Sequence, residues 1–208
     1  MTGPTALELT VGPFTFDAVA DGPPAGDPVL LLHGFPEGAY CWRGITPALA
    51  AAGFRTVAPD QRGYSPRARP TEPDDYRMDL LVGDALALAD ELGWDTFHLV
   101  GHDWGGAVVQ GWSVAHQDRL AGLVLCNTGI AVPAGRRAPS LIRLAAAGPM
   151  TDLACRRTRL FVDGTMWLSW RRIPAEMRPA FRAPYRRAAD RAAVRDFVAD
   201  VPFDDRHP

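Results

Sequence analysis

The segment HLVGHDWGGAVVQGW, residues 98–112, carries a carboxylate where a predicted strand passes into a predicted helix. Apolar residues precede it, and apolar residues at helical spacing follow it. Asp103 lies between Gly101 and Gly105, and small residues two positions away relieve crowding at a sharp strand-to-helix turn. A helix N-terminus favours negative charge, and a carboxylate is ionised at neutral pH. Such a group can attack an sp³ carbon that bears a leaving group and form an alkyl ester.

Two further motifs precede this turn in the chain. HGFPE, residues 33–37, directly follows the apolar run PVLLLH, residues 28–33. PDQRGYS, residues 59–65, follows a second predicted strand at residues 54–59. A continuous apolar run of this length is typical of a strand that is buried on both faces of a parallel sheet.

The first 130 residues alternate between strand-like and helix-like segments. Strands that alternate with helices predict right-handed crossovers and a mostly parallel sheet, hence an α/β fold. The first two strands are expected to form a hairpin around Gly12 and Pro13. The predicted strands are residues 6–11, 14–20, 28–33, 54–59, 96–101 and 120–127, and the predicted helices are residues 42–52, 77–92 and 105–116.

The composition changes after Ile130, where the chain becomes rich in Arg, Ala and Pro. Short helical patches occur there without a convincing buried strand. We therefore predict two units, a sheet-containing core over residues 1–132 and a helical cap over residues 133–208.

HGFPE, PDQRGYS and GHDWGG in this order resemble the α/β-hydrolase fold over about residues 6–130. The Asp at the turn is similar to the epoxide hydrolase and haloalkane dehalogenase branch of that fold. The resemblance implies an α/β-hydrolase core with a helical cap and Asp103 as nucleophile. It also implies an oxyanion hole formed by the backbone N–H groups of Phe35 and Trp104. No cofactor and no metal are expected, and the substrate would be a small apolar electrophile.

Epoxides and haloalkanes are the first two candidate substrate classes for this chemistry. Epoxide hydrolases of this type use cap tyrosines as donors to the epoxide oxygen, which makes Tyr185 a candidate donor. In the dehalogenases the Trp104 indole would hold the leaving group together with a second donor, often an Asn where this chain has Phe35. Trp167 or Trp170 could take the place of that second donor. We favour epoxide hydrolysis, with a haloalkane as the alternative.

The stretch RAPYRRAADRAAVRDFVADVPFDDRHP resembles a dehalogenase-type cap. In particular it resembles the β-lactone decarboxylases of long-chain olefin biosynthesis, so a β-lactone is a further alternative. From another class of function, the chain could be a non-catalytic ligand-binding member or an inactive fragment.

Hydrolysis of the alkyl ester needs a histidine to activate water and an acid to orient that histidine. His33 and His102 are expected to make structural hydrogen bonds, and no histidine follows a late strand. We therefore predict that these residues form the N-terminal portion of a longer hydrolase, without the C-terminal part of its sheet. The acid and the histidine are then expected beyond residue 208, the chain alone should not turn over, and the strand at 120–126 should be an open edge.

The composition is that of a globular protein: 208 residues, 47% hydrophobic, with a net charge of −2. No signal peptide or membrane span is evident, which predicts a cytoplasmic protein. Every basic residue is Arg; residues 1–135 hold 7 against 16 acidic residues, whereas residues 136–208 hold 15 against 8. The basic half could face a fused or docked partner domain. No nucleic-acid-binding motif accompanies the arginines.

Overall fold

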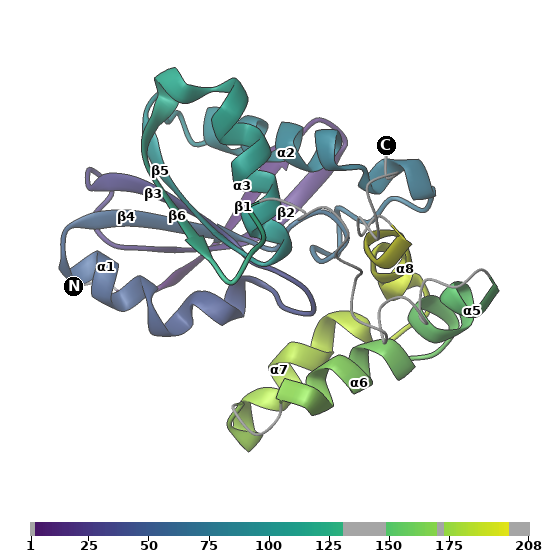
Figure 1. The fold of residues 1–208 in the computed structure, drawn as a ribbon. Coiled ribbons are helices and arrows are strands. Elements are labelled where there is room, and N and C mark those ends of the chain that lie inside the picture. The colour runs from purple at the N-terminus through teal and green to yellow at the C-terminus, as the bar shows by residue number, and fades with distance from the viewer. Residues whose placement is uncertain (1–2, 131–148, 170–172, 200–208) are drawn as a thin grey trace.

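The computed structural model describes residues 3–130, 149–169 and 173–199 (Figure 1). Six strands form one sheet in the order β1-β2-β4-β3-β5-β6. β1, β2 and β4 pair antiparallel, and β4, β3, β5 and β6 pair parallel, which confirms the mostly parallel sheet and the N-terminal hairpin. The strands are β1 (Thr5–Val11), β2 (Phe14–Asp21), β3 (Asp27–Leu32), β4 (Phe54–Pro59), β5 (Phe97–His102) and β6 (Leu120–Cys126).

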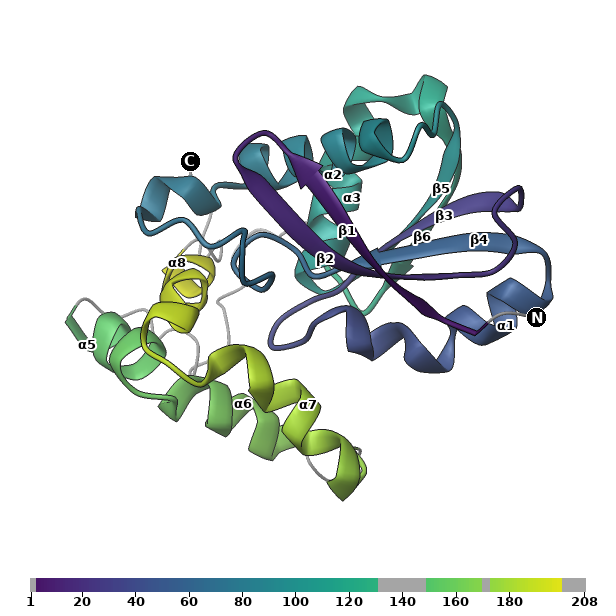
Figure 2. The same cartoon turned by 180° about the vertical axis from the view of Figure 1, so that it is seen from behind.

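Helices cover both faces of the sheet (Figures 1 and 2). α2 (Met78–Glu91) and α3 (Trp104–Ala115) lie together on one face, and α1 (Thr46–Ala51) lies on the other. β3 is apolar from Pro28 to Leu32, because alternate side chains enter the two cores. Leu30 and Leu32 pack in the core on the α2 and α3 side, whereas Val29 and Leu31 pack in the smaller core with Trp42 and Ala58.

The predicted helix over residues 42–52 is divided in the structure. A 3₁₀ segment, η1, runs over Ala39–Gly44, and α1 begins at Thr46. Pro47 stands in the first turn of α1, where its missing N–H costs nothing but where it could not continue a preceding helix. The predicted helix over 77–92 corresponds to α2, and Gly93 follows its end with φ +69°.

The part of the cap that the structure describes is helical and contains no strand. α6 and α7 lie side by side away from the sheet, whereas α8 lies close to the loop that leads into α2 (Figures 1 and 2). The predicted boundary at residues 132 and 133 falls outside the described residues. The segments are α5 (Pro149–Thr151), the π-helical turn η4 (Asp152–Arg157), α6 (Leu160–Ser169), η5 (Ala175–Met177), α7 (Arg178–Arg182), η6 (Ala183–Tyr185), η7 (Ala189–Arg191) and α8 (Ala192–Ala199).

β6 forms one edge of the sheet, as predicted. Its consecutive residues Leu123 and Val124, which point to opposite faces, are 37% and 52% exposed. An apolar strand of this kind is usually covered on both faces, so β6 is an unprotected edge among the described residues. None of the helices in the described ranges is long and apolar enough to cross a membrane.

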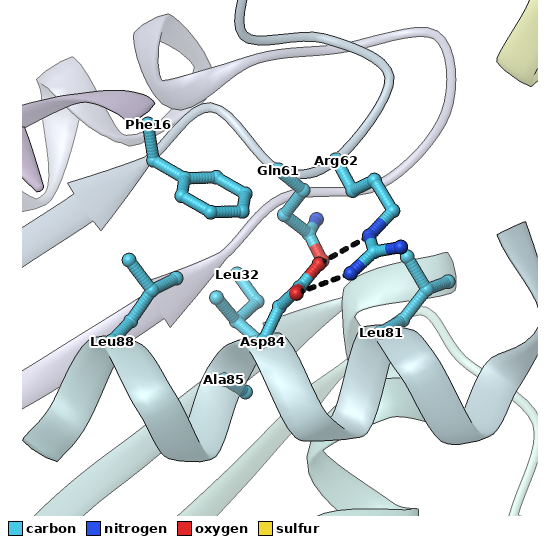
Figure 3. A pocket seen from close by; sticks show the side chains of 8 residues that line it. All are labelled: Phe16, Leu32, Gln61, Arg62, Leu81, Asp84, Ala85 and Leu88. Atoms are coloured by element: carbon cyan, nitrogen blue, oxygen red, sulfur yellow. Dashed lines mark hydrogen bonds and ion pairs between the residues drawn. The ribbon is translucent and has the colours of Figure 1, made fainter. Parts of the chain in front are cut away.

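A buried ion pair fixes the loop after β4 to α2 (Figure 3). The Arg62 guanidinium donates from Nε and Nη2 to the two carboxylate oxygens of Asp84, at 2.7 and 2.6 Å. The Arg62 Nη1 also donates to the Asp75 carbonyl oxygen at 3.0 Å. Both residues of the pair are less than a tenth exposed. The loop that carries the PDQRGYS motif is therefore attached to α2 by this ion pair.

Candidate active site

Asp103 stands at the sharp turn between β5 and α3, with φ +53° and ψ −117°. Residues other than Gly rarely adopt this conformation, so the surrounding structure must hold it. The Asp103 N–H donates to the Cys126 carbonyl oxygen at 3.2 Å, and the Thr128 hydroxyl donates to the Asp103 carbonyl oxygen at 2.9 Å. These bonds tie the turn to the end of β6.

The glycines around this turn allow α3 to approach β3 and β5. A Cβ on Gly105 would meet the carbonyl oxygens of Leu32 and His33 at the end of β3. A Cβ on Gly101 would lie 2.6 Å from the Gly105 carbonyl oxygen. These obstacles are backbone atoms, which cannot rotate away, so the small residues predicted from the sequence are required by contact.

Replacing Gly105 by Ala should therefore destabilise the protein strongly. We expect a loss of about 2–3 kcal/mol in the free energy of unfolding, as in overpacked cores. Urea denaturation would measure it. Gly83→Ala in α2 is the control, because a Cβ on Gly83 would meet nothing within 4 Å, and this variant should be neutral or slightly stabilising. Equal behaviour of the two variants would contradict the packing argument.

The loop after β3 supplies a backbone donor to the Asp103 carboxylate. The Phe35 N–H donates to Asp103 Oδ1 at 2.9 Å. Gly34 permits this approach, because a Cβ there would lie 2.7 Å from the same oxygen. Trp104 is the first residue of α3, so its N–H is among those that lack an intrahelical acceptor. Of the two N–H groups predicted for the oxyanion hole, that of Phe35 contacts the carboxylate, and Trp104 directly follows Asp103 in the chain.

A cavity of about 150 Å³ lies where the core faces the cap, with Asp103 in its wall. The core side is polar around the carboxylate, and the cap side is apolar. The cap residues Met166 and Phe181 belong to α6 and α7, and sequence reasoning did not single them out. The lining residues are Phe35, Pro36, Glu37, His102, Asp103, Met166, Ile173 and Phe181.

Glu37 and His102 form a half-buried pair in this cavity. Glu37 Oε2 lies 2.9 Å from His102 Nδ1, and both side chains are about a quarter exposed. The hydrogen bond with Glu37 raises the pKa of His102, and the nearby carboxylates of Glu37 and Asp103 add to this against the opposing effect of burial. Burial alone would raise the pKa of Glu37, but the hydrogen bond and positive charge of His102 lower it. The imidazole that neighbours Asp103 in the chain therefore has its protonated form favoured by this pairing.

This pair predicts a stability maximum in mildly acidic solution. The raised pKa of His102 adds stability below its ordinary value of about 6.5, and this is lost as the pH rises through the raised pKa. The lowered pKa of Glu37 adds stability above about 4.3, which is lost as the pH falls through the lowered pKa. We expect urea midpoints to report up to about 1 kcal/mol more stability near pH 6 than near pH 8.5. Glu37→Gln should flatten that difference, and an unchanged profile would contradict the assignment.

His33 plays a different part from His102. It is fully buried, its Nδ1 lies 2.9 Å from the Gly34 carbonyl oxygen, and its Nε2 accepts from the Gln61 N–H at 3.1 Å. Burial lowers the pKa of His33, which keeps the ring neutral. Both histidines make the hydrogen bonds that were expected of them: His33 joins the loop after β3 to the loop after β4, and His102, at the end of β5, contacts Glu37 in the loop after β3.

Aromatic rings from core and cap gather beside the carboxylate. Tyr185 is 2% exposed, and its ring centroid lies 6.2 Å from that of Phe35 and 6.1 Å from that of Tyr64. The Trp104 ring packs against Phe197 of α8 at 5.4 Å. Tyr64 was not anticipated as a site residue, although it lies in the PDQRGYS motif.

The two cap tryptophans predicted to bind substrate have different outcomes. Trp167 is 66% exposed on α6, and its neighbour Met166 lines the cavity in its place. The structure therefore places Trp167 outside the site. Trp170 lies outside the described residues.

The fold has counterparts in known proteins. Residues 27–150 match the family model of the alpha/beta hydrolase fold. The chain belongs to the α/β-hydrolase fold family. Within it, the chain is similar to epoxide hydrolases: Epoxide hydrolase B of Mycobacterium tuberculosis is 46% identical over 143 residues, which cover 64% of this chain and 40% of that protein.

A second relative matches the cap as well. Cis-3-alkyl-4-alkyloxetan-2-one decarboxylase of Xanthomonas campestris is 31% identical over 209 residues, covering 96% of this chain and 69% of that protein. Among solved structures, an epoxide hydrolase from metagenomes of hot environments has a TM-score of 0.81 and 28% identity, covering 100% of this chain and 73% of that one. The haloalkane dehalogenase DbeA from Bradyrhizobium elkani shares the fold, with a TM-score of 0.87 at 24% identity, over 96% of this chain and 70% of that one.

Proposed function

We propose that this chain carries the alkylating half of an epoxide hydrolase, with Asp103 as nucleophile. The observation that carries the proposal is the Asp103 carboxylate at a strained turn, beside a cavity with an apolar cap side, with one oxygen held by the Phe35 N–H. That hydrogen bond leaves the second oxygen available for attack. The similarity to epoxide hydrolases supports an epoxide as the electrophile.

The first step joins a carboxylate oxygen of Asp103 to one ring carbon of the epoxide. The bond between that carbon and the epoxide oxygen breaks, its electron pair stays on the oxygen, and the oxygen is stabilised by a hydrogen-bond donor. Tyr185 is the proposed donor. Water then attacks the carboxyl carbon of the ester, and the N–H groups of Phe35 and Trp104 hold the oxyanion.

The second step needs a base, and the described histidines near Asp103 do not suit that task. His33 is buried with both ring nitrogens engaged. His102 is paired with Glu37, and its raised pKa favours the protonated form. We therefore expect the alkyl ester to accumulate on this chain.

The direct test is covalent capture. Incubation with styrene oxide should raise the intact mass by one molecule of the epoxide, and peptide mapping should place it on Asp103. The adduct should persist, because its hydrolysis is slow. Absence of an adduct, or an adduct elsewhere, would overturn the proposal. Rapid release of the diol would contradict only the expectation that hydrolysis of the ester is slow.

A β-lactone is the second candidate substrate, and the match that runs through the cap to an oxetan-2-one decarboxylase favours it. An oxetan-2-one that loses CO₂ leaves an alkene, whereas an epoxide that gains water leaves a diol. Incubation with a dialkyl oxetan-2-one and gas chromatography for the alkene would distinguish the two. An alkene from the lactone without an adduct from the epoxide would favour the decarboxylase.

A further inference from the structure

Arg69 joins the loop after β4 to the cap. The loop also carries Tyr64, and the cap turn carries Tyr185, so the two segments that Arg69 connects are more than a hundred residues apart in sequence. The guanidinium donates from Nη1 to Asp190 Oδ1 at 2.7 Å, from Nη2 to the carbonyl oxygens of Tyr64 at 2.6 Å and Pro184 at 3.4 Å, and from Nε to the Gly63 carbonyl oxygen at 3.2 Å.

This contact is shielded from solvent. The side chains of Arg69 and Asp190 are 14% and 8% exposed. Asp190 Oδ2 also accepts from the Arg187 N–H at 3.0 Å, which stiffens the turn around the carboxylate. Arg67, two residues earlier, forms ion pairs with Glu8 and Asp17, but its side chain is 50% exposed. The same loop therefore offers a buried pair and a surface control.

A second arginine, this one from the cap, also binds the turn that carries Tyr185. Arg191, only 4% exposed, donates from Nη1 to the Tyr185 carbonyl oxygen and from Nε to the Arg156 carbonyl oxygen, both at 2.8 Å. Adjacent carbonyl groups, those of residues 184 and 185, are thus bound by arginines from the core and from the cap. The backbone at Tyr185 has little freedom while both contacts persist.

The phenol groups of Tyr64 and Tyr185 are what this arrangement holds in place. Both residues are at most 4% exposed, and beyond the contact between the two phenols neither hydroxyl has a hydrogen-bond partner within the described residues. Burial raises the pKa of both, and the negative charge of Asp103 raises that of Tyr64 further. Two buried phenols in contact with each other, one of them close enough to feel the charge of Asp103, suit a ligand oxygen that accepts a hydrogen bond.

We propose that Arg69 is a positioning residue of this site: it holds the turn that carries Tyr185 against the loop that carries Tyr64, so that the two phenols meet beside Asp103. The effect on alkylation rests on the proposed function. The effect on the phenols does not, because it follows from the hydrogen bonds of Arg69 alone.

Tyrosine nitration tests the positioning without any activity. The chain has four tyrosines, and tetranitromethane with peptide mapping reports each of them. Tyr40, 41% exposed, should react in every variant, and the buried Tyr76 in none. In Arg69→Gln we expect Tyr185 to become reactive several-fold faster than in the wild type. Arg69→Lys should keep part of the protection, and Arg67→Gln should change nothing.

Asp190→Asn provides a second way to weaken the contact, and it leaves the loop over residues 63–70 unaltered. It should expose Tyr185 in the same direction. Nitration of the buried Tyr76 in Arg69→Gln would mean that this variant has lost more than one local contact. The reactivity of Tyr185 in Asp190→Asn would then decide whether the contact protects it. Unchanged nitration of Tyr185 in both variants would overturn the proposal.

The rate of Asp103 alkylation by styrene oxide gives the functional readout. Arg69→Gln should slow it by about tenfold, as small displacements of positioned groups do, with recovery in Arg69→Lys. If the wild type forms no adduct, the proposed function fails while the nitration result still decides the role of Arg69. An adduct that forms equally fast in Arg69→Gln would show that Arg69 stabilises the cap without positioning the site.

Discussion

Replacement of Asp103 by Asn should abolish covalent capture of an epoxide. A carboxamide is uncharged, and its oxygen is a poor nucleophile, so we expect the rate of adduct formation to fall at least about 10³-fold. The fold should survive, because the Asn oxygen can still accept the Phe35 N–H and Asn tolerates positive φ. Intact-mass kinetics would measure the rate, with the thermal midpoint as control. A variant that alkylates at the wild-type rate would exclude Asp103 as the nucleophile.

The strain at this turn can be isolated with two further variants. Asp103→Ala and Asp103→Gly both lose the carboxylate and its hydrogen bond, so they differ mainly in backbone freedom. At φ +53° and ψ −117° Gly should be more stable than Ala by about 1–3 kcal/mol. Urea denaturation of the pair gives that difference, and a more stable Ala variant would mean that the turn is not strained.

Breaking the ion pair between Arg62 and Asp84 should have the largest effect on stability. Arg62→Met leaves the Asp84 carboxylate in an apolar setting between Leu81 and Leu88 (Figure 3), and we expect a loss of about 3–5 kcal/mol. Asp84→Leu should cost a comparable amount, because the guanidinium then keeps only one hydrogen bond, to a backbone carbonyl, and its contact with the Phe14 ring.

The double variant Arg62→Met/Asp84→Leu tests the cause of that loss. Apolar side chains of similar size remove both charges together, so much of the stability should return. Urea denaturation at neutral pH would measure all three variants. If the double variant loses the sum of the single losses, the charges do not interact as the geometry indicates.

The sequence predicted the sheet well because the local pattern was decisive. Each parallel strand is a short apolar run between turn signals, and a run such as residues 28–32 has few alternatives. The glycines around Asp103 likewise predicted a tight turn, since close approach of backbone leaves no space for a Cβ. These features depend on neighbours in the chain.

The site depends instead on contacts between distant residues, which a single sequence does not reveal. Nothing in the residue types pairs Glu37 with His102, or Arg69 with Asp190. Tyr64 is not predictable as a site residue for a similar reason, because a tyrosine in a loop motif has no pattern that shows which element covers it. The domain boundary, the cytoplasmic location, the partner domain and the base beyond residue 208 stay predictions.

The cap shows why an aromatic residue in the sequence is a poor guide to a substrate contact. α6 is apolar on nearly every side, so helical periodicity does not separate its inner face from its outer one. Phe161, Val162 and Met166 turn out to be buried, whereas Leu160 and Trp167 are about two-thirds exposed. A tryptophan on such a helix therefore gave no reliable sign of a substrate contact.

The contact between Arg69 and Asp190 limits how this fold can be recombined. Chimeras that exchange caps between relatives are a natural way to transfer substrate preference, since the described cap follows the core strands as later segments of the chain. A donor cap would fit this core only if it brought a carboxylate to the position of Asp190. Without one, the graft would leave the buried guanidinium of Arg69 with backbone carbonyl oxygens of the core loop but no carboxylate. Compatibility of caps across the family should therefore follow this pair of residues more closely than overall sequence identity.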